Sequence, residues 1–288
     1  MIMKTKFFMP VILAGVLAFT SCDKDDDNIG VSAEFQTAFD ALYPNATGVS
    51  WEREGNYYVA DFWRVDMNSE AEAWFNGTAQ WQMTVTEINY NGLPQAVKDA
   101  YTAGEYGSWR VEDVDMVERT GMETVYVLEV ENGNQEYDLY YATDGTLIKA
   151  VADSGNNNPS NYITEEVSST IKGFISTNYP DARIVEIEKE GTRVEVDIID
   201  GNIHREVVFT SNGEWKYTRT EVRMADLPQT VVKAFIESQY NRYSVDDIDL
   251  YNTPDGDFYI FELDSEPNDV HIKISLDGTI ETVSNNAV

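Results

Sequence analysis

Two hydrophobic periodicities alternate along the chain and predict short helices separated by strands. The first predicted helix has four apolar residues at helical spacing: Phe35, Ala38, Phe39 and Leu42. Tyr43-Pro44 ends this stretch, because proline cannot continue the helical hydrogen-bond ladder. From Tyr57 to Val65, and again around Trp81, the period changes to two, which is typical of strands with one buried face.

A second helix is predicted to begin at Leu93-Pro94, where proline is tolerated in the first turn. The strands are expected to be joined by tight hairpins whose turns need residues with positive φ: Asn76-Gly77, Asp144-Gly145, Asn212-Gly213 and Asp277-Gly278. These elements predict an α+β fold. Each unit would be an antiparallel sheet with two helices on one face and the other face open to solvent or a partner.

The pattern occurs twice, which indicates a tandem duplication. Tyr43-Pro44-Asn45-Ala46 recurs as Tyr179-Pro180-Asp181-Ala182, and Leu93-Pro94-Gln95 recurs as Leu227-Pro228-Gln229. Trp81 and Trp215 occupy equivalent positions and are expected to pack alike. A polar stretch rich in Gly, Asn and Pro separates the copies. We therefore predict domains at 31–152 and 161–288, joined by a linker at 153–160.

These landmarks resemble a known family. Helices that end in Tyr-Pro-x-Ala, helices that begin at Leu-Pro, and a closing Asp-Gly-Thr hairpin are similar to PepSY-like, β-lactamase-inhibitor-like proteins of Bacteroidota. The resemblance implies helices on one side of a curved antiparallel sheet and an open concave surface that holds another protein. It carries over no contact residues, and a fold does not settle a function.

The N-terminus is predicted to be a lipoprotein signal peptide, residues 1–21. Lys4 and Lys6 precede an apolar run that is too short to span a bilayer, and small residues lead to Cys22, the single cysteine. Leu17-Ala18-Phe19-Thr20-Ser21-Cys22 resembles the bacterial lipobox, with Phe19 where Leu is usual. Lipidation of Cys22 would anchor the mature chain to the outer membrane, either at the cell surface or at the periplasmic face.

An acidic run follows this cysteine within the predicted tether, residues 22–30. Asp23, Lys24, Asp25, Asp26 and Asp27 resemble the signal that directs Bacteroidota lipoproteins to the cell surface. The run also fits a solvated tether. Part of it matches the spacing of an EF-hand calcium loop, but Asn28 replaces the glycine of the turn, so no metal ligands are assigned.

The charge of the chain limits its partners. The net charge is −31, and removal of Lys4 and Lys6 with the signal peptide makes it −33. Such a field repels phosphate, so nucleic acid is not expected as a partner. A basic protein or a cation such as calcium suits it. With one cysteine there is no disulfide framework, so packing must stabilise the fold.

The sequence contains few side chains or motifs suited to catalysis, so we predict no catalytic residues and no cofactors. No nucleophile motif, zinc motif or nucleotide-binding loop is present. His204 and His271 are interpreted as surface residues of strands. The recurring pairs Asp113/Asp115 and Asp247/Asp249 are interpreted as turn and strand-edge residues.

The tryptophans suggest a contact surface, because five of the six lie in the first copy. Trp74 alternates with Glu70 and Glu72 on the polar side of its strand and is expected to be exposed. Trp74 and Trp63 are the candidate partner contacts. The favoured function is a non-catalytic module that binds a protein partner, such as a secreted hydrolase, through an open sheet face. A calcium-responsive surface protein and a glycan-active enzyme stay open as alternatives.

Overall fold

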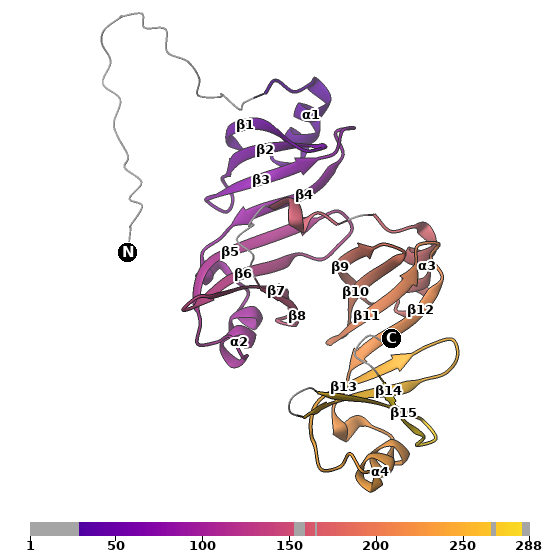
Figure 1. Ribbon diagram of the computed structural model, residues 1–288. Helices are drawn as coiled ribbons and strands as arrows, with labels where there is room; N and C mark the ends of the chain where they lie inside the picture. Colours follow the sequence, from indigo (N-terminus) through magenta and orange to yellow (C-terminus); the bar gives the residue numbers. More distant parts are fainter. Residues whose placement is uncertain (1–28, 153–158, 165, 266–268, 284–288) are drawn as a thin grey trace, which may run out of the picture.

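The chain forms two antiparallel sheets of eight strands each. The computed structural model describes residues 29–152, 159–164, 166–265 and 269–283. In both sheets every strand pairs with the next one in sequence, as a meander. Figure 1 shows sheet one in indigo to magenta and sheet two in salmon to yellow. The predicted α+β class with antiparallel sheets is confirmed.

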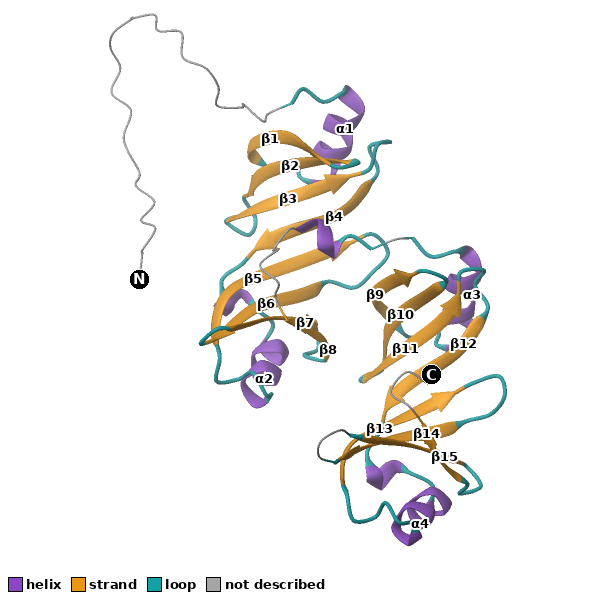
Figure 2. Ribbon diagram, in the orientation of Figure 1, coloured by secondary structure: helices purple, strands orange, loops and turns teal. Residues whose placement is uncertain are grey.

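Each sheet has two short helices, one against each half (Figure 2). The first unit contains α1 (Ala33–Leu42), β1 (Thr47–Glu54), β2 (Tyr57–Arg64), β3 (Ser69–Phe75), β4 (Trp81–Glu87), α2 (Gln95–Ala103), β5 (Arg110–Arg119), β6 (Val125–Asn132), β7 (Gln135–Ala142) and β8 (Leu147–Ala152). The second contains α3 (Ser169–Asn178), β9 (Arg183–Glu190), β10 (Arg193–Asp200), β11 (Ile203–Thr210), β12 (Trp215–Glu221), α4 (Gln229–Glu237), β13 (Ser244–Asn252), β14 (Phe258–Asp264), β15 (Val270–Ser275) and β16 (Ile280–Val283).

The helices bury their apolar sides on one face of sheet one. In α1, Phe35 and Phe39 are one turn apart and pack against Phe62 of β2. In α2, Val97 and Tyr101 do the same against β6 and β7. Pro94 is the N-cap of α2 and lies just before the first turn, where its missing N–H costs nothing. The residues that alternate with these contacts therefore point to the opposite face.

The duplication is visible in matching buried contacts. The Tyr43 hydroxyl and the Trp81 indole N–H donate to Thr84 Oγ1, at 2.7 and 2.9 Å. In the second copy, the Tyr179 hydroxyl is hydrogen-bonded to Thr218 Oγ1 at 3.0 Å, and the Trp215 indole N–H donates to the same oxygen at 3.1 Å. The prediction that Trp81 and Trp215 pack alike is confirmed.

Three of the four predicted hairpin turns have their glycine in the left-handed region. Gly145, Gly213 and Gly278 have φ of 89°, 83° and 88°. A Cβ on Gly145 would lie 2.5 Å from the carbonyl oxygen of Ala96, so only glycine lets this turn approach α2. The prediction for Asn76-Gly77 is wrong, because Ala79 provides the left-handed residue there, with φ of 58°.

The two sheets contact each other through the end of sheet one that contains β5–β8. Val117, Val125 and Ile148 pack with Val185 and Ile199 of sheet two. At the centre of this interface Arg119 is ion-paired with Glu186, with side-chain exposures of 3% and 7%. The segment Pro159–Ile163 crosses from one unit to the other, and Tyr162 and Ile163 pack on the face of sheet one that the helices leave open.

The predicted signal peptide, Cys22 and the acidic run 23–27 lie outside the described residues, as do residues 153–158 of the predicted linker. Within the part of the chain that is described, none of the helices is both long and apolar enough to cross a bilayer.

Candidate binding groove

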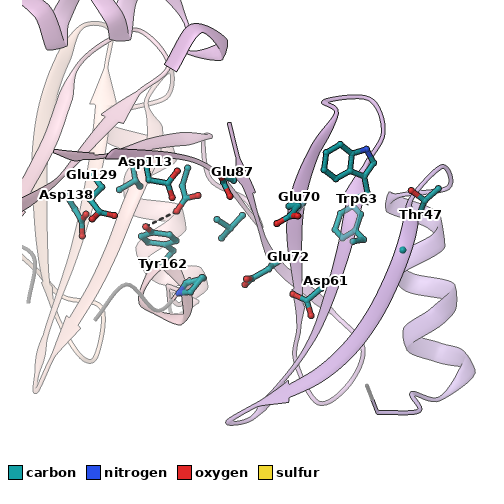
Figure 3. Close-up of a pocket in the computed structure, with 17 residues that line it drawn as sticks. Thr47, Asp61, Trp63, Glu70, Glu72, Glu87, Asp113, Glu129, Asp138 and Tyr162 are labelled. Atoms are coloured by element: carbon teal, nitrogen blue, oxygen red, sulfur yellow. Dashed lines mark hydrogen bonds between the residues drawn. The ribbon is translucent and has the colours of Figure 1, made fainter. Parts of the chain in front are cut away.

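A groove of about 570 Å³ lies on the face of sheet one opposite the helices (Figure 3). Its walls hold eight carboxylates from six neighbouring strands: Asp61, Glu70, Glu72, Glu87, Asp113, Asp115, Glu129 and Asp138. No basic side chain is among the described residues that line it. The groove is therefore a concentrated negative field within one concave surface.

Strand alternation places these carboxylates together. Asp61 lies between Ala60 and Phe62, which contact α1, so its side chain points away from the helix. Cross-strand pairing then aligns Asp61 with Glu72, and Glu72 with Val85. Residues paired directly across strands have their side chains on the same face, about 4.5–5.5 Å apart at Cβ.

The interpretation of Asp113 and Asp115 as turn and strand-edge residues is wrong. Both lie within β5, and both line the groove. Their neighbours Val114 and Met116 are buried on the helix side, so period-two alternation turns the two carboxylates toward the groove. Asp115 accepts a hydrogen bond of 3.2 Å from the Tyr162 hydroxyl, which reaches it from the segment between the two units (Figure 3).

Crowding and burial shift the ionisation of these acids. Burial, together with the charge of Asp61, raises the pKa of Glu72 to about 7, while the Trp74 indole N–H, 3.2 Å away, opposes the shift. Burial also raises the pKa of Asp115 to about 7, helped by Asp113 and opposed by the hydrogen bond from Tyr162. A nearby positive charge would lower the pKa values of both carboxyl groups.

These shifts predict that the protein loses stability as the pH rises from about 4 to about 7. In that interval the folded chain binds more protons than the unfolded chain, so the free energy of unfolding falls with pH. Replacing Glu72 with Gln is expected to raise the free energy of unfolding at about pH 8 by about 1 kcal/mol, allowing for solvent screening. Urea unfolding at about pH 5 and pH 8 measures this change. Glu70→Gln, an exposed neighbour on β3, is the control, and equal pH slopes for the two variants would contradict the prediction.

The two candidate tryptophans differ. Trp63 is 38% exposed and lines the groove beside Glu70. Trp74 points to the same face, but its exposure is 0%, because it packs with Val59 and Met83 beneath Tyr162 and Ile163. The expectation that Trp74 is exposed is wrong, since a segment distant in sequence covers it.

Both histidines are more buried than expected. His204 Nε2 lies 2.9 Å from Asp197 Oδ1, and the carboxylate is buried. His271 is 15% exposed at its side chain and lies 3.8 Å from Glu262. Both lie in strands, β11 and β15, as interpreted, but they are half-buried and not fully exposed.

Residues 56–149, 159–202 and 192–282 match the family described as "Putative beta-lactamase-inhibitor-like, PepSY-like". The chain belongs to this family. The matched segments fall on both sheets, so this PepSY-like protein contains the family fold in two copies.

Solved structures from Bacteroides are similar to parts of this PepSY-like protein. A BLIP-like protein from Bacteroides fragilis is 39% identical, with a TM-score of 0.43, and the match covers 47% of this chain and 96% of that one. A DUF2874 family protein from Bacteroides uniformis is 32% identical, with a TM-score of 0.42, over 45% and 95% of the two chains. A chain from Bacteroides eggerthii named "putative periplasmic proteins" is 24% identical, with a TM-score of 0.43, over 46% and 99%. No curated protein matches the sequence.

Local sequence patterns indicated the open sheet face but not the convergence of the groove acids. The signal was present, because Asp61, Glu72 and Asp115 each alternate with apolar residues on their strands. What the sequence did not show was that residues from Asp61 to Asp138 would meet, since this depends on the register between strands.

Proposed function

We propose that this protein is a non-catalytic binding module of the cell envelope that holds a cationic segment of a partner protein in the groove of sheet one. The observation that carries the proposal is the convergence of eight carboxylates on one concave face whose described lining contains no basic side chain. A cationic segment would complement the charge of this face, and the exposed ring of Trp63 would add apolar contact area.

A defined basic peptide tests the proposal. The protein would be residues 22–288 with Cys22→Ser, and the probes would be peptides of three Gly-Arg or three Gly-Lys units, measured by calorimetry. The triple variant Asp61→Asn, Glu70→Gln, Glu72→Gln is expected to weaken binding of the Gly-Arg peptide at least about tenfold, because charge-assisted hydrogen bonds are lost.

A charge-matched control separates the groove from the overall field. Glu34→Gln, Asp40→Asn and Glu237→Gln remove the same charge from exposed positions on α1 and α4. This control is expected to leave the affinity within about twofold, because exposed charges separated by more than about 10 Å are screened at ordinary salt. Equal losses in the two triple variants would remove the groove as the binding site.

Calcium and glycan chemistry are the competing functions. Among the described residues, the group whose ligand atoms lie within 4.8 Å of one another is Glu195, Asp197 and Glu206, in sheet two. These acids already contact Arg193, His204 and Arg219. Glu72 and Asp115 have raised pKa values, as the general acid of a glycosidase does. Such an enzyme also needs a second carboxyl that stays ionised. Calcium binding in calorimetry, or glycoside hydrolysis that Glu72→Gln abolishes, would replace the proposal.

We also propose that the module is lipid-anchored at Cys22, with the acidic run 23–27 directing it to the outer surface. The small residues before Cys22 and the run behind it support this localisation. Cys22→Ser is expected to move most of the protein from the membrane fraction to the soluble fraction. Protease treatment of intact cells distinguishes the surface from the periplasmic face. Wild-type and Cys22→Ser protein in the same fraction would contradict the anchor.

A further inference from the structure

The two sheets have the same carboxylates at equivalent positions of their ladders. On sheet one the paired row runs from Asp61 through Glu72 to Val85. On sheet two it runs from Asp197 through Glu206 to Arg219. Val85 pairs onward with Val117 and Arg219 with Tyr251, which makes Asp115 and Asp249 equivalent as well, each two residues earlier on its strand. Val85 therefore stands where the second copy has Arg219.

Arg219 fills the acidic site of sheet two from within the chain. Its Nε donates to Glu206 Oε2 at 2.8 Å, and its Nη2 donates to the other oxygen of the same carboxylate. Its Nη1 donates to Asp249 Oδ2 at 3.1 Å. One guanidinium thus bridges two carboxylates on strands β11 and β13, as its planar fork of donors allows.

The equivalent carboxylates of sheet one have no such bridge. Val85 is buried and uncharged, and it lines the floor of the groove. Glu72 accepts from the Trp74 indole and Asp115 accepts from the Tyr162 hydroxyl. Neither carboxylate forms an ion pair within the described residues. Sheet two also lacks a carboxylate at the position of Glu70, because His204 occupies the equivalent place.

We propose that sheet one binds the guanidinium of an arginine side chain of the partner protein above Val85, between Glu72 and Asp115, in the position that Arg219 fills in sheet two. This inference rests on the proposed function and names the partner group. The spacing of the carboxylates is set by the same antiparallel ladder in both sheets, so a fork that fits one pair fits the other. Trp63 lines the same groove and offers a ring to the segment that carries the arginine.

The geometry favours arginine over calcium or lysine. Calcium takes about 6–8 oxygens at about 2.3–2.6 Å, and the metal-compatible group found among the described residues lies on sheet two. Lysine presents a compact point charge that cannot bond two separated carboxylates as a planar fork does.

The test compares the Gly-Arg and Gly-Lys peptides on the protein (residues 22–288 with Cys22→Ser) and on Val85→Arg, which copies the second sheet. The wild type is expected to bind the Gly-Arg peptide at least about tenfold tighter than the Gly-Lys peptide, since only a guanidinium bonds both carboxylates as a fork. Val85→Arg is expected to reduce that affinity at least about tenfold, because its own side chain occupies the site. Ile236→Arg, the same change on an exposed residue of α4, is the control and should stay within about twofold of the wild type.

The reverse variant adds a gain of function. Arg219→Val removes the internal guanidinium, and the stoichiometry for the Gly-Arg peptide is expected to rise from one to two. If both peptides bind equally, and Val85→Arg weakens binding no more than Ile236→Arg does, the guanidinium assignment fails while the basic-partner function stands. If neither peptide binds and neutralising the groove changes nothing, the proposed function fails as well. The comparison of the two peptides on the wild-type side chains decides the question even where Val85→Arg or Arg219→Val does not fold.

Discussion

Replacing Arg119 with methionine is expected to lower the free energy of unfolding by about 3–5 kcal/mol, because it leaves a buried carboxylate without its partner. Arg119 Nη1 lies 3.1 and 3.0 Å from the two oxygens of Glu186, and both side chains are almost fully buried. Its Nη2 also donates to the carbonyl of Val185 at 2.5 Å. Lys149 Nζ is 3.9 Å from Glu186 and cannot replace these contacts without moving. Urea unfolding at neutral pH measures the loss.

Two further variants separate charge from packing at this interface. Arg119→Met combined with Glu186→Leu should recover most of the lost stability, because no unpaired charge is left inside. Lys149→Met removes a cation at the margin, 29% exposed, and should cost within about 1 kcal/mol. A double variant as unstable as the single one would show that the shape of Arg119, and not its charge, holds the sheets together.

Trp74→Ala is expected to destabilise the protein by about 3–5 kcal/mol, the usual cost of removing a buried large aromatic ring. Trp74 is fully buried on the open face of sheet one, where it contacts Val59 and Met83 under Tyr162 and Ile163. Its ring also lies edge-on to Tyr57, with centroids 6.0 Å apart. Thermal and urea unfolding measure the effect.

Trp63→Ala is the matched control, on the next strand and the same face. With 38% of its surface exposed, Trp63 should cost about 1 kcal/mol or less in stability while weakening binding of the basic peptide. A Trp74 variant that kept full stability would contradict the burial beneath the segment 159–163. A Trp63 variant that bound normally would remove this ring from the contact surface.

Local patterns in the sequence were sufficient for the elements and for the duplication. Helical spacing and the Tyr-Pro end predicted α1, which runs from Ala33 to Leu42. The Asp144-Gly145 turn was predicted because a tight hairpin needs positive φ, which Gly145 provides. The Asn76-Gly77 turn failed because the same dipeptide can lie in a longer loop, where Ala79 takes the left-handed conformation.

The contacts of the groove and of the interface between the sheets could not be predicted from local sequence patterns. Trp74 was assigned to the correct face of its strand and was expected to be exposed, because nothing local indicates that Tyr162 and Ile163 return to cover it. Asp115 and Tyr162 meet across 47 residues of sequence, and Arg119 and Glu186 across 67. Such pairs depend on strand register and on how the two units dock, and a shift of one residue would turn every side chain to the other face.

The two-copy α+β plan, the helix ends, most of the turns and the strongly acidic charge were predictable from the sequence, because they follow from neighbouring residues and from composition. Which acids converge and which aromatic rings stay exposed depends on the three-dimensional contacts. The same holds for Arg219, which pairs with carboxylates of sheet two, while Val85 stands at the equivalent position of sheet one. The physical reason is that a meander sheet brings residues far apart in the chain to within about 5 Å of each other across its strands, at positions fixed only by the register of the whole ladder.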